Sequence, residues 1–431
     1  MMAIEAELQA QVDAQLMEQG TFAPLDLLFN LGRLIYSDYE AWRRREMDLL
    51  DDALMGDRAK ILAELDRAAA YARSIGLVEQ PQEFLAWGRE SAGIEVGAGA
   101  AEVQGAVGAA TANKPLRISA EPRLQRLIGS RYLPAQSAPQ MDLFFDNPVV
   151  TLTNGIARAL CARDAAEGHR QLDRLYVQAP NHPDLAAFDR LVGGLDDLSR
   201  PVENPAARLE ALEALTPTAR HMLGAGSRDY LSPLWRHLAD ALAEHAFLPA
   251  EPNLHRSFAL TQAQDWMGVS ESILGEAEWW LHPPLCLRLA DSAFRRRRRV
   301  EALTAWCHLC WAAAEQVAPA VERLRQPDLS GLWQLFLDCE EDSAPSGAPG
   351  PALTASDFPA WLLLREPGLA RQLSVDLPRG SSPAEERYRC AHRWIHAHRA
   401  HRQDEEMALR RSLQQSHPVL FEVLKRSVEV K

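Results

Sequence analysis

The residues best suited to chemistry are the cysteines of the Cys307-x-x-Cys310 pattern. Two thiolates at this spacing can bind zinc or form a redox pair, and Cys286 on the preceding predicted helix supplies a third thiol. On a helix, both residues of the pattern lie on one apolar face, whereas His308 points away from it. Because a buried cysteine behaves as a small hydrophobe, we interpret these thiols as core residues. A metal or redox role is the alternative.

A second candidate is the histidine-rich stretch from Cys390 to His401. His392 and His396 are four residues apart and share one helix face, but the remaining histidines lie on another face. No glutamate follows the first histidine as it does in metalloprotease helices. The sequence therefore favours solvated or partner-facing histidines, with a metal site at His392 and His396 as the alternative.

Five consecutive arginines occupy a predicted turn between two helices: Arg295, Arg296, Arg297, Arg298 and Arg299. A basic block can bind nucleic acid or an acidic protein. The whole chain has 46 basic and 59 acidic residues, a net charge of −13, which argues against general polyanion binding. We expect a solvated turn or an acidic protein partner here, with nucleic acid as the alternative.

Trp279 and Trp280 precede the His282-Pro283 pair, with Leu281 between them. Adjacent residues on a helix do not share a face, so the pattern predicts that one indole is exposed. An exposed tryptophan is a frequent anchor of protein interfaces, whereas packing at a helix end is the alternative. The predicted partner-binding residues are thus these two tryptophans and the five arginines.

The sequence contains none of the common catalytic motifs, neither GxxxxGK[ST] nor GxSxG, HExxH, HRD or DFG. The Gly/Ala-rich segment 97–113 lacks the third glycine and the preceding strand of a dinucleotide-binding loop. We therefore predict a protein that is not an enzyme and needs no cofactor. A triad assembled from distant residues would leave no such motif.

The composition is that of a soluble globular protein, with 431 residues, 47% hydrophobic and 24% charged. The first residues lack a basic and apolar signal pattern, and no run of about 18 apolar residues predicts a membrane span. Six cysteines are too few for a disulfide scaffold. We expect a cytoplasmic protein with no membrane partner, and the style of composition suggests a bacterial source.

Apolar residues follow helical spacing along almost the whole chain, which predicts an all-α fold. Helical steps run from Trp42 to Leu54, Gly56 suits a left-handed helix end, and Asp57 can cap the next helix. No strand pattern is clear, because the best strand candidate, 149–153, more plausibly opens a helix. The pattern predicts a small N-terminal helical domain over residues 1–93 and a Gly/Ala-rich flexible linker over 94–115. The pattern further predicts an array of helical hairpins over 116–341, an exposed loop over 342–353 and C-terminal helical hairpins over 354–431.

Three His-Pro pairs mark predicted joints between helices: His182-Pro183, His282-Pro283 and His417-Pro418. Proline is tolerated at the first helical position, and the residue before it must leave the helical region. Each pair therefore predicts a helix end followed by a new helix. Two apolar stripes joined by so short a turn pack as an antiparallel αα-hairpin.

The hairpins around the first and third pairs resemble tetratricopeptide repeats, which have a small residue in the second helix, a large apolar residue four positions later and a final proline. Gly168, Leu172 and Pro180 match that order. Around the second pair, Ala302 and Trp306 match, but the proline comes late. In the hairpin around the third pair, Met407 replaces the small residue. The Trp-x-x-Leu-Gly motif with which the family's repeats usually start is absent. The resemblance covers about a third of the chain and implies stacked hairpins, an α-solenoid with a protein-binding groove and no catalysis.

These observations predict a non-enzymatic adaptor or scaffold whose partners are other protein subunits. A bacterial multiprotein system, such as a secretion apparatus or an anti-phage system, would be a natural setting. A nucleic-acid-associated subunit that uses Arg295–Arg299 and a metal or redox protein that uses Cys307 and Cys310 are the alternatives. An ordinary irregular helical domain is the alternative to repeats.

Overall fold

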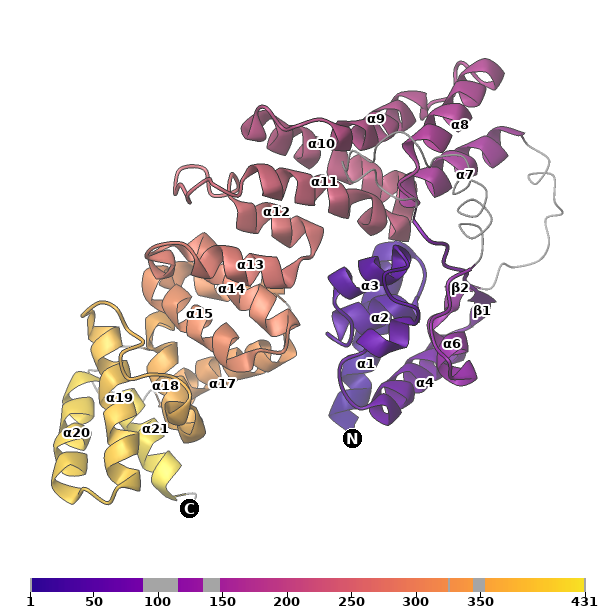
Figure 1. Cartoon of the computed structure of the whole chain (residues 1–431). Coiled ribbons are helices and arrows are strands. Elements are labelled where there is room, and N and C mark those ends of the chain that lie inside the picture. The colour runs from indigo at the N-terminus through magenta and orange to yellow at the C-terminus, as the bar shows by residue number, and fades with distance from the viewer. Residues whose placement is uncertain (1, 88–114, 135–147, 325, 344–352, 430–431) are drawn as a thin grey trace. The chain divides into compact units, whose positions relative to one another are not determined.

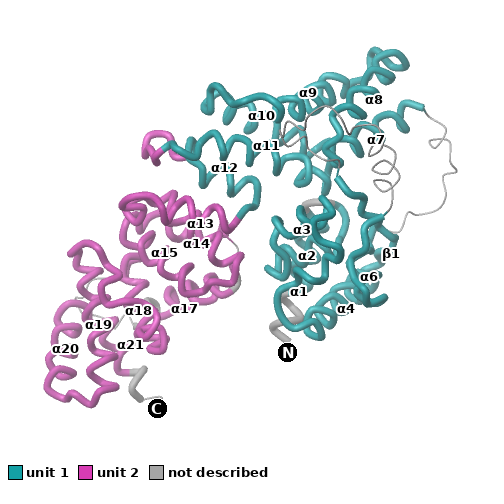
Figure 2. Tube along the Cα trace, in the orientation of Figure 1, with its two compact units in different colours: residues 1–245, 253–265 teal, residues 246–252, 266–431 magenta. Residues whose placement is uncertain are grey.

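The computed structural model describes residues 2–87, 115–134, 148–324, 326–343 and 353–429. This part of the chain is mostly helical, as predicted. It forms two compact units: unit 1 comprises residues 1–245 and 253–265, and unit 2 comprises residues 246–252 and 266–431 (Figures 1 and 2). Nearly all of the predicted linker at 94–115 and most of the predicted loop at 342–353 lie outside the described residues.

Unit 1 begins with an N-terminal module, which we define as residues 2–87 and 115–134. Its elements are α1 (Met2–Gln19), α2 (Pro24–Asn30), α3 (Tyr36–Arg43), the 3-10 turn η1 (Leu50–Ala53), α4 (Arg58–Ser74), β1 (Leu77–Pro81), α6 (Pro122–Ile128) and β2 (Ser130–Pro134). Asp57 caps α4 as predicted, since its carboxylate accepts from the Lys60 amide at 2.8 Å. Gly56 has a φ of +110°, which favours glycine at this turn.

The predicted helical spacing from Trp42 to Leu54 is not one helix. α3 ends at Arg43, and only the short η1 follows. The chain turns at Arg45, whose φ is +61°. The Arg43 carbonyl accepts a hydrogen bond from the Trp87 amide at 2.8 Å, so this carbonyl is bonded to the segment after β1 and not to the next helical turn.

Two strands that the sequence pattern did not reveal close the N-terminal module. β1 and β2 pair antiparallel, with Leu77 opposite Pro134 and Pro81 opposite Ser130. Residues 116–134, which we predicted to belong to the hairpin array, pack instead in the N-terminal core. Their buried side chains contact the same cluster as Trp42 and Leu65, and they are Ile118, Leu124, Leu127, Ile128 and Tyr132.

The remainder of unit 1 is the first array, which we define as α7–α12. Its elements are α7 (Pro148–Cys161), α8 (Ala165–Gln178), α9 (Leu185–Asp196), η2 (Asp197–Ser199), α10 (Pro205–Leu223), η3 (Gly224–Gly226), α11 (Ser227–Ala241) and α12 (Arg256–Ala263). Each helix packs against the next one along the chain (Figure 1). Residues 149–153 open α7, which confirms the helical interpretation of that segment.

Unit 2 holds the remaining helices. They are α13 (Trp266–Leu274), η4 (Trp279–Leu281), α14 (Pro283–Arg295), α15 (Arg299–Ala312), η5 (Ala314–Gln316), α16 (Val317–Leu324), α17 (Pro327–Ser343), η6 (Ala355–Asp357), α18 (Phe358–Arg365), η7 (Pro367–Arg371), α19 (Pro383–Arg399), α20 (Gln403–Ser416) and α21 (Pro418–Glu429). The predicted array at 116–341 is therefore divided between the two units, because the compact cores separate near residues 245–266.

All three His-Pro pairs lie at joints between helices, as predicted. His182 and Pro183 lie between α8 and α9, Pro283 is the first residue of α14, and Pro418 is the first residue of α21. A continuous tetratricopeptide-like solenoid stays a prediction. Among the described helices, none combines the length and the apolar character that a membrane crossing needs.

Candidate functional site

The tryptophan pair predicted to bind a partner packs largely within unit 2. Trp279 is buried, and its ring centroid lies 5.2 Å from that of His308. Trp280 is partly buried and has the Arg379 guanidinium 5.0 Å from its ring centroid. The side chain of η4 that is most exposed is Leu281, at 56%. A partner-binding role of the two indoles stays a prediction.

The five arginines lie at the joint between α14 and α15. Three form ion pairs within unit 2: Arg295 with Asp291 at 2.9 Å, Arg296 with Glu301 at 3.4 Å and Arg299 with Glu366 at 2.9 Å. Arg297 and Arg298 are exposed. Because local carboxylates neutralise most of the run, its attraction for a polyanion is smaller than the sequence suggests.

The three candidate thiols, Cys286, Cys307 and Cys310, are buried. Burial raises the pKa of Cys286 to about 12 and raises the pKa of Cys307 and Cys310 as well, so all three are protonated near neutral pH. Metal ligation and redox exchange need a thiolate. Within the described residues, no group of three or more His, Cys, Asp or Glu side chains is arranged to hold a metal ion.

His308, which we expected to point away from the apolar face of α15, is buried too. Nearly every residue from Ala302 to Cys310 is buried, because α15 has neighbours on several sides. Burial, together with the nearby Arg379, lowers the pKa of His308 to about 4. The imidazole is therefore neutral at physiological pH.

His392 and His396 share a helix face, as their spacing predicts, with ring centroids 4.8 Å apart. The Nε2 atom of His392 lies 2.9 Å from the Leu373 carbonyl, and that of His396 lies 3.1 Å from the Ala370 carbonyl. A carbonyl only accepts, so both rings donate from Nε2. These hydrogen bonds join α19 to η7 and to the residues directly after it.

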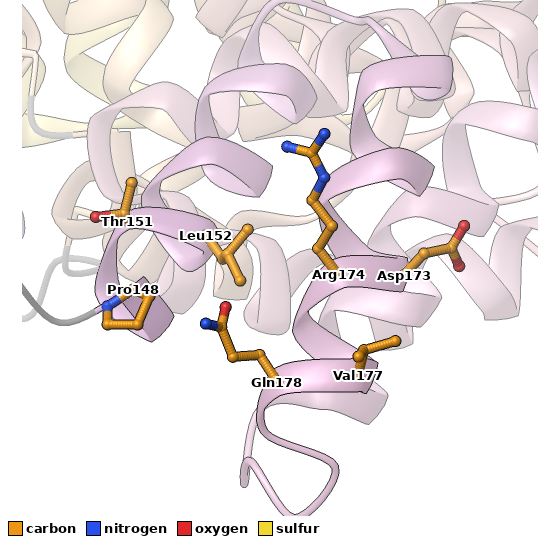
Figure 3. A pocket seen from close by; sticks show the side chains of 7 residues that line it. All are labelled: Pro148, Thr151, Leu152, Asp173, Arg174, Val177 and Gln178. Carbon is orange, nitrogen blue, oxygen red and sulfur yellow. The ribbon is translucent and has the colours of Figure 1, made fainter.

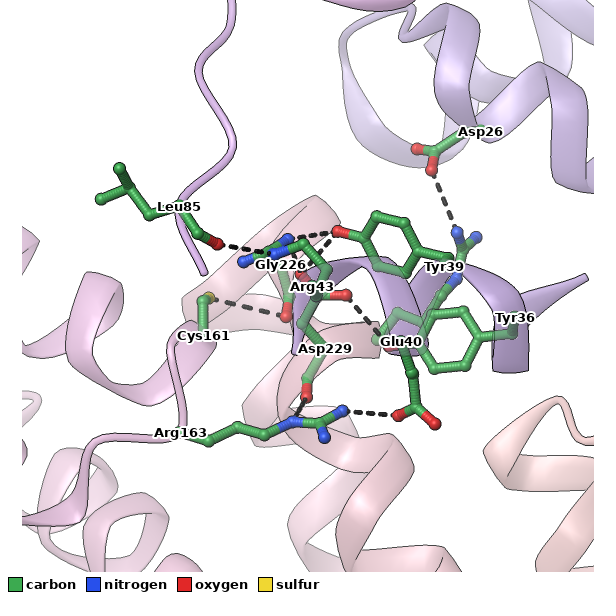
Figure 4. A network of polar contacts seen from close by, with 11 residues as sticks. Asp26, Tyr36, Tyr39, Glu40, Arg43, Leu85, Cys161, Arg163, Gly226 and Asp229 are labelled. Carbon is green, nitrogen blue, oxygen red and sulfur yellow. Dashed lines mark hydrogen bonds and ion pairs between the residues drawn. The ribbon is translucent and has the colours of Figure 1, made fainter. Parts of the chain in front are cut away.

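The structure instead gathers charged side chains inside unit 1, where the N-terminal module meets the first array. We define the joint network as Tyr36, Tyr39, Glu40, Arg43, Arg163 and Asp229 (Figure 4). The first four residues share one face of α3 and point toward α11 and the α7–α8 turn. Tyr36 and Tyr39 donate their hydroxyl protons to the two oxygens of Asp229, at 3.0 and 3.3 Å.

Two arginines complete the joint network. Arg43 pairs with Asp229 at 3.1 Å and also donates to the Tyr39 hydroxyl. Arg163 pairs with Glu40 at 2.8 Å and donates from Nε to the main-chain carbonyl of Asp229 at 2.9 Å. Burial, reinforced by the Asp229 charge, raises the pKa of both tyrosines, which therefore remain hydrogen-bond donors.

Spacing along α3 could have revealed the joint network. Tyr36, Tyr39 and Arg43 follow steps of three and four, so aromatic and charged side chains share one face. The partners Arg163 and Asp229 are far away in sequence, and no local pattern identifies them.

A cavity of about 660 Å³ lies beside the joint network in unit 1. Residues of α2, α3, β2 and α7 line it together with the joint between α10 and α11. Cys161 lies in its wall, with Sγ 3.5 Å from the Gly226 carbonyl (Figure 4). Burial, together with the Asp229 charge, raises the pKa of Cys161 to about 12, so this thiol is a poor nucleophile.

A more open groove of about 880 Å³ lies between α7 and α8. Pro148 and Leu152 contribute apolar surface from α7, and Val177 contributes it from α8, with Asp173 and Arg174 on the same side (Figure 3). Val177 is 86% exposed. We call this feature the α7–α8 groove.

No protein-family model, no curated protein and no solved structure matches this chain. The class that the fold defines is a mostly helical protein of two compact units, in which many helices that are consecutive in the chain pack together.

Proposed function

We propose that this chain is a non-enzymatic interaction module, an adaptor or scaffold that binds another protein subunit. The α7–α8 groove carries the proposal, because an aliphatic side chain as exposed as Val177 stands beside a hollow between two helices. A tetratricopeptide-like solenoid, a cytoplasmic location and a bacterial multiprotein system belong to the same proposal. Its support is the packing of helices in chain order and the three His-Pro joints.

The chemistry of the α7–α8 groove indicates its partner. Asp173 and Arg174 form no ion pair with any described residue, and both line the groove beside Val177. A partner segment with one aliphatic side chain between a basic and an acidic residue would pair with both charges and cover the valine. Opposite charges at the edge of an interface give orientation more than affinity.

The test is affinity purification of the tagged full chain from its native host, in parallel with Val177→Lys and the control Met407→Lys. Met407 is 50% exposed on α20 of unit 2, so its substitution adds the same charge on an exposed helix outside the groove. We expect a stoichiometric protein partner with the native chain and the control, and a loss of at least about tenfold with Val177→Lys. If both variants retain the partner equally, the α7–α8 groove is not its binding site.

The two alternatives have weaker support. Nucleic-acid binding would depend on an arginine run of which three members already pair with carboxylates. A steep salt dependence of RNA or DNA binding that disappears on substitution of Arg297, Arg298 and Arg299 by alanine would favour it. A metal role would require Cys307 and Cys310 to lose protons inside an apolar core, and a stoichiometric metal content in the purified protein would favour it.

A further inference from the structure

The cavity of unit 1 has more arginines in its wall than carboxylates. Its arginines are Arg43, Arg131, Arg158 and Arg228, and its acidic residues are Asp26, Glu83 and Asp229. Four positive and three negative charges leave an excess of one positive charge. The cavity is partly open, since Arg158 is exposed and Arg131 is partly buried. Guanidinium groups that line such a cavity attract oxyanions, because the planar fork of donors matches a carboxylate or a phosphate.

The ion pairs in the wall show which arginines remain available. Arg43 pairs with Asp229 at 3.1 Å, and Arg228 pairs with Asp26 at 3.0 Å. The other two arginines have only neutral partners.

Arg131 donates to the Thr21 hydroxyl at 3.0 and 3.3 Å, and Arg158 donates from Nε to the Asn154 carbonyl of its own helix at 3.3 Å. Neither guanidinium has a carboxylate partner among the described residues. Both therefore have donors left for a ligand, since each guanidinium carries five N–H groups.

The rest of the wall indicates the shape of the ligand. Phe29, Tyr39 and Phe84 line the same cavity, so it offers apolar, aromatic surface beside the charges. A volume of about 660 Å³ lies within the range of small-molecule sites, which are mostly apolar with a few convergent polar groups. Inorganic phosphate alone would leave most of this space unfilled.

We propose that this cavity binds a small organic oxyanion, a carboxylate or a phosphate ester with a flat apolar part. Arg131 of β2 and Arg158 of α7 hold the anionic group, and the aromatic side chains contact the apolar part. Because β2 belongs to the N-terminal module and α7 to the first array, the bound ligand joins these two parts of unit 1. Ligand binding therefore stabilises unit 1 against unfolding.

Calorimetric titration of the full chain tests the proposal. The probes are benzoate, phenyl phosphate, inorganic phosphate and the neutral benzyl alcohol. We expect one equivalent of benzoate or phenyl phosphate to bind, and the tighter of the two identifies the anionic group. Benzyl alcohol and inorganic phosphate should each bind at least about tenfold more weakly, since each lacks one of the two required parts.

Variants locate the site. Arg131→Gln and Arg158→Gln should each weaken binding about tenfold or more. Arg190→Gln is the matched control, because the Nε of Arg190 also donates to a carbonyl of its own helix at 3.3 Å but lies outside the cavity. It should leave binding unchanged, and circular dichroism should show that all three variants fold.

Three results would overturn the proposal. One is that neither benzoate nor phenyl phosphate binds below about 10 mM, which is weaker than a specific site of this kind allows. Another is that the control variant loses as much affinity as the two cavity variants. The third is that inorganic phosphate binds as tightly as phenyl phosphate. In that case the apolar part of the ligand contributes nothing to binding, and the site does not select an organic anion.

Discussion

At the residue scale, α3 carries a buried carboxylate that depends on arginines from elsewhere in unit 1. Glu40 is only 1% exposed. It pairs with Arg163 at 2.8 Å and also with Arg236. Removing one member of a buried ion pair is costly, because the other charge stays desolvated and loses its counter-charge.

Glu40→Gln tests this dependence. We expect the substitution to lower the free energy of unfolding of unit 1 by about 3–5 kcal/mol, since it removes the buried carboxylate that Arg163 and Arg236 share. Urea unfolding followed by circular dichroism measures the change. Glu46→Gln is the control, because Glu46 is exposed in the same module and its loss should change stability by less than about 0.5 kcal/mol. If both variants change the free energy of unfolding by the same small amount, the buried ion pairs of Glu40 do not stabilise unit 1.

His308 predicts a dependence of unit 2 on pH. Its pKa is about 4 in the fold and about 6.5 in an unfolded chain, since burial disfavours the imidazolium. Above pH 6.5 neither state binds the proton, so the residue has no effect. Between pH 6.5 and 4 only the unfolded state binds it, so stability falls as the pH falls, by up to about 3 kcal/mol.

Denaturant unfolding at pH 7 and pH 5 measures this effect. The native chain should lose about 2 kcal/mol from this residue between the two pH values. In His308→Phe, which keeps an aromatic ring beside Trp279 and Trp311 but cannot titrate, the loss should be smaller by that amount. An unchanged loss in the variant would exclude His308 as its source.

At the element scale, one buried carboxylate holds the start of α18 to α19. Arg387 of α19 donates from Nε to Asp357 at 2.6 Å. The other oxygen of Asp357 accepts from the Thr354 amide at 3.0 Å, which completes a capping box. The same carboxylate therefore caps one helical segment and pairs with another.

Asp357→Asn should lower the free energy of unfolding of unit 2 by about 3 kcal/mol or more, because Arg387 would remain partly buried without a counter-charge. Thermal unfolding monitored by calorimetry measures it. Asp404→Asn, at an exposed position in the first turn of α20, should cost less than about 1 kcal/mol. If both substitutions cost the same, the buried pair has no special role.

The elements themselves were predictable to different degrees. The His-Pro joints could be predicted because proline acts locally, on its own residue and the one before it. The pairing of β1 with β2 could not, because each strand has five residues and no short hairpin turn joins them. Likewise, α3 contains four of the six residues of the joint network. Asp229 lies 186 residues beyond Arg43, however, and only the folded chain brings these two residues together.

At the scale of the whole molecule, the two compact units predict two unfolding transitions. Each unit has a core of its own, so a calorimetric scan of the full chain should resolve two components. Glu40→Gln should shift only one of them, and Asp357→Asn only the other, since the two residues lie in different units. A single transition that both variants shift equally would show that the units unfold together.

The order in which the chain visits the two units has a practical consequence. Residues 246–252 belong to unit 2, whereas residues 253–265 return to unit 1. The ring centroids of Phe247 and His282 lie 4.8 Å apart, and the Asn253 amide donates to the Glu213 carboxylate at 3.4 Å. No single truncation point therefore yields two intact units. An expression fragment that ends at residue 245 lacks α12 and the rest of residues 253–265, and one that begins at residue 266 lacks residues 246–252.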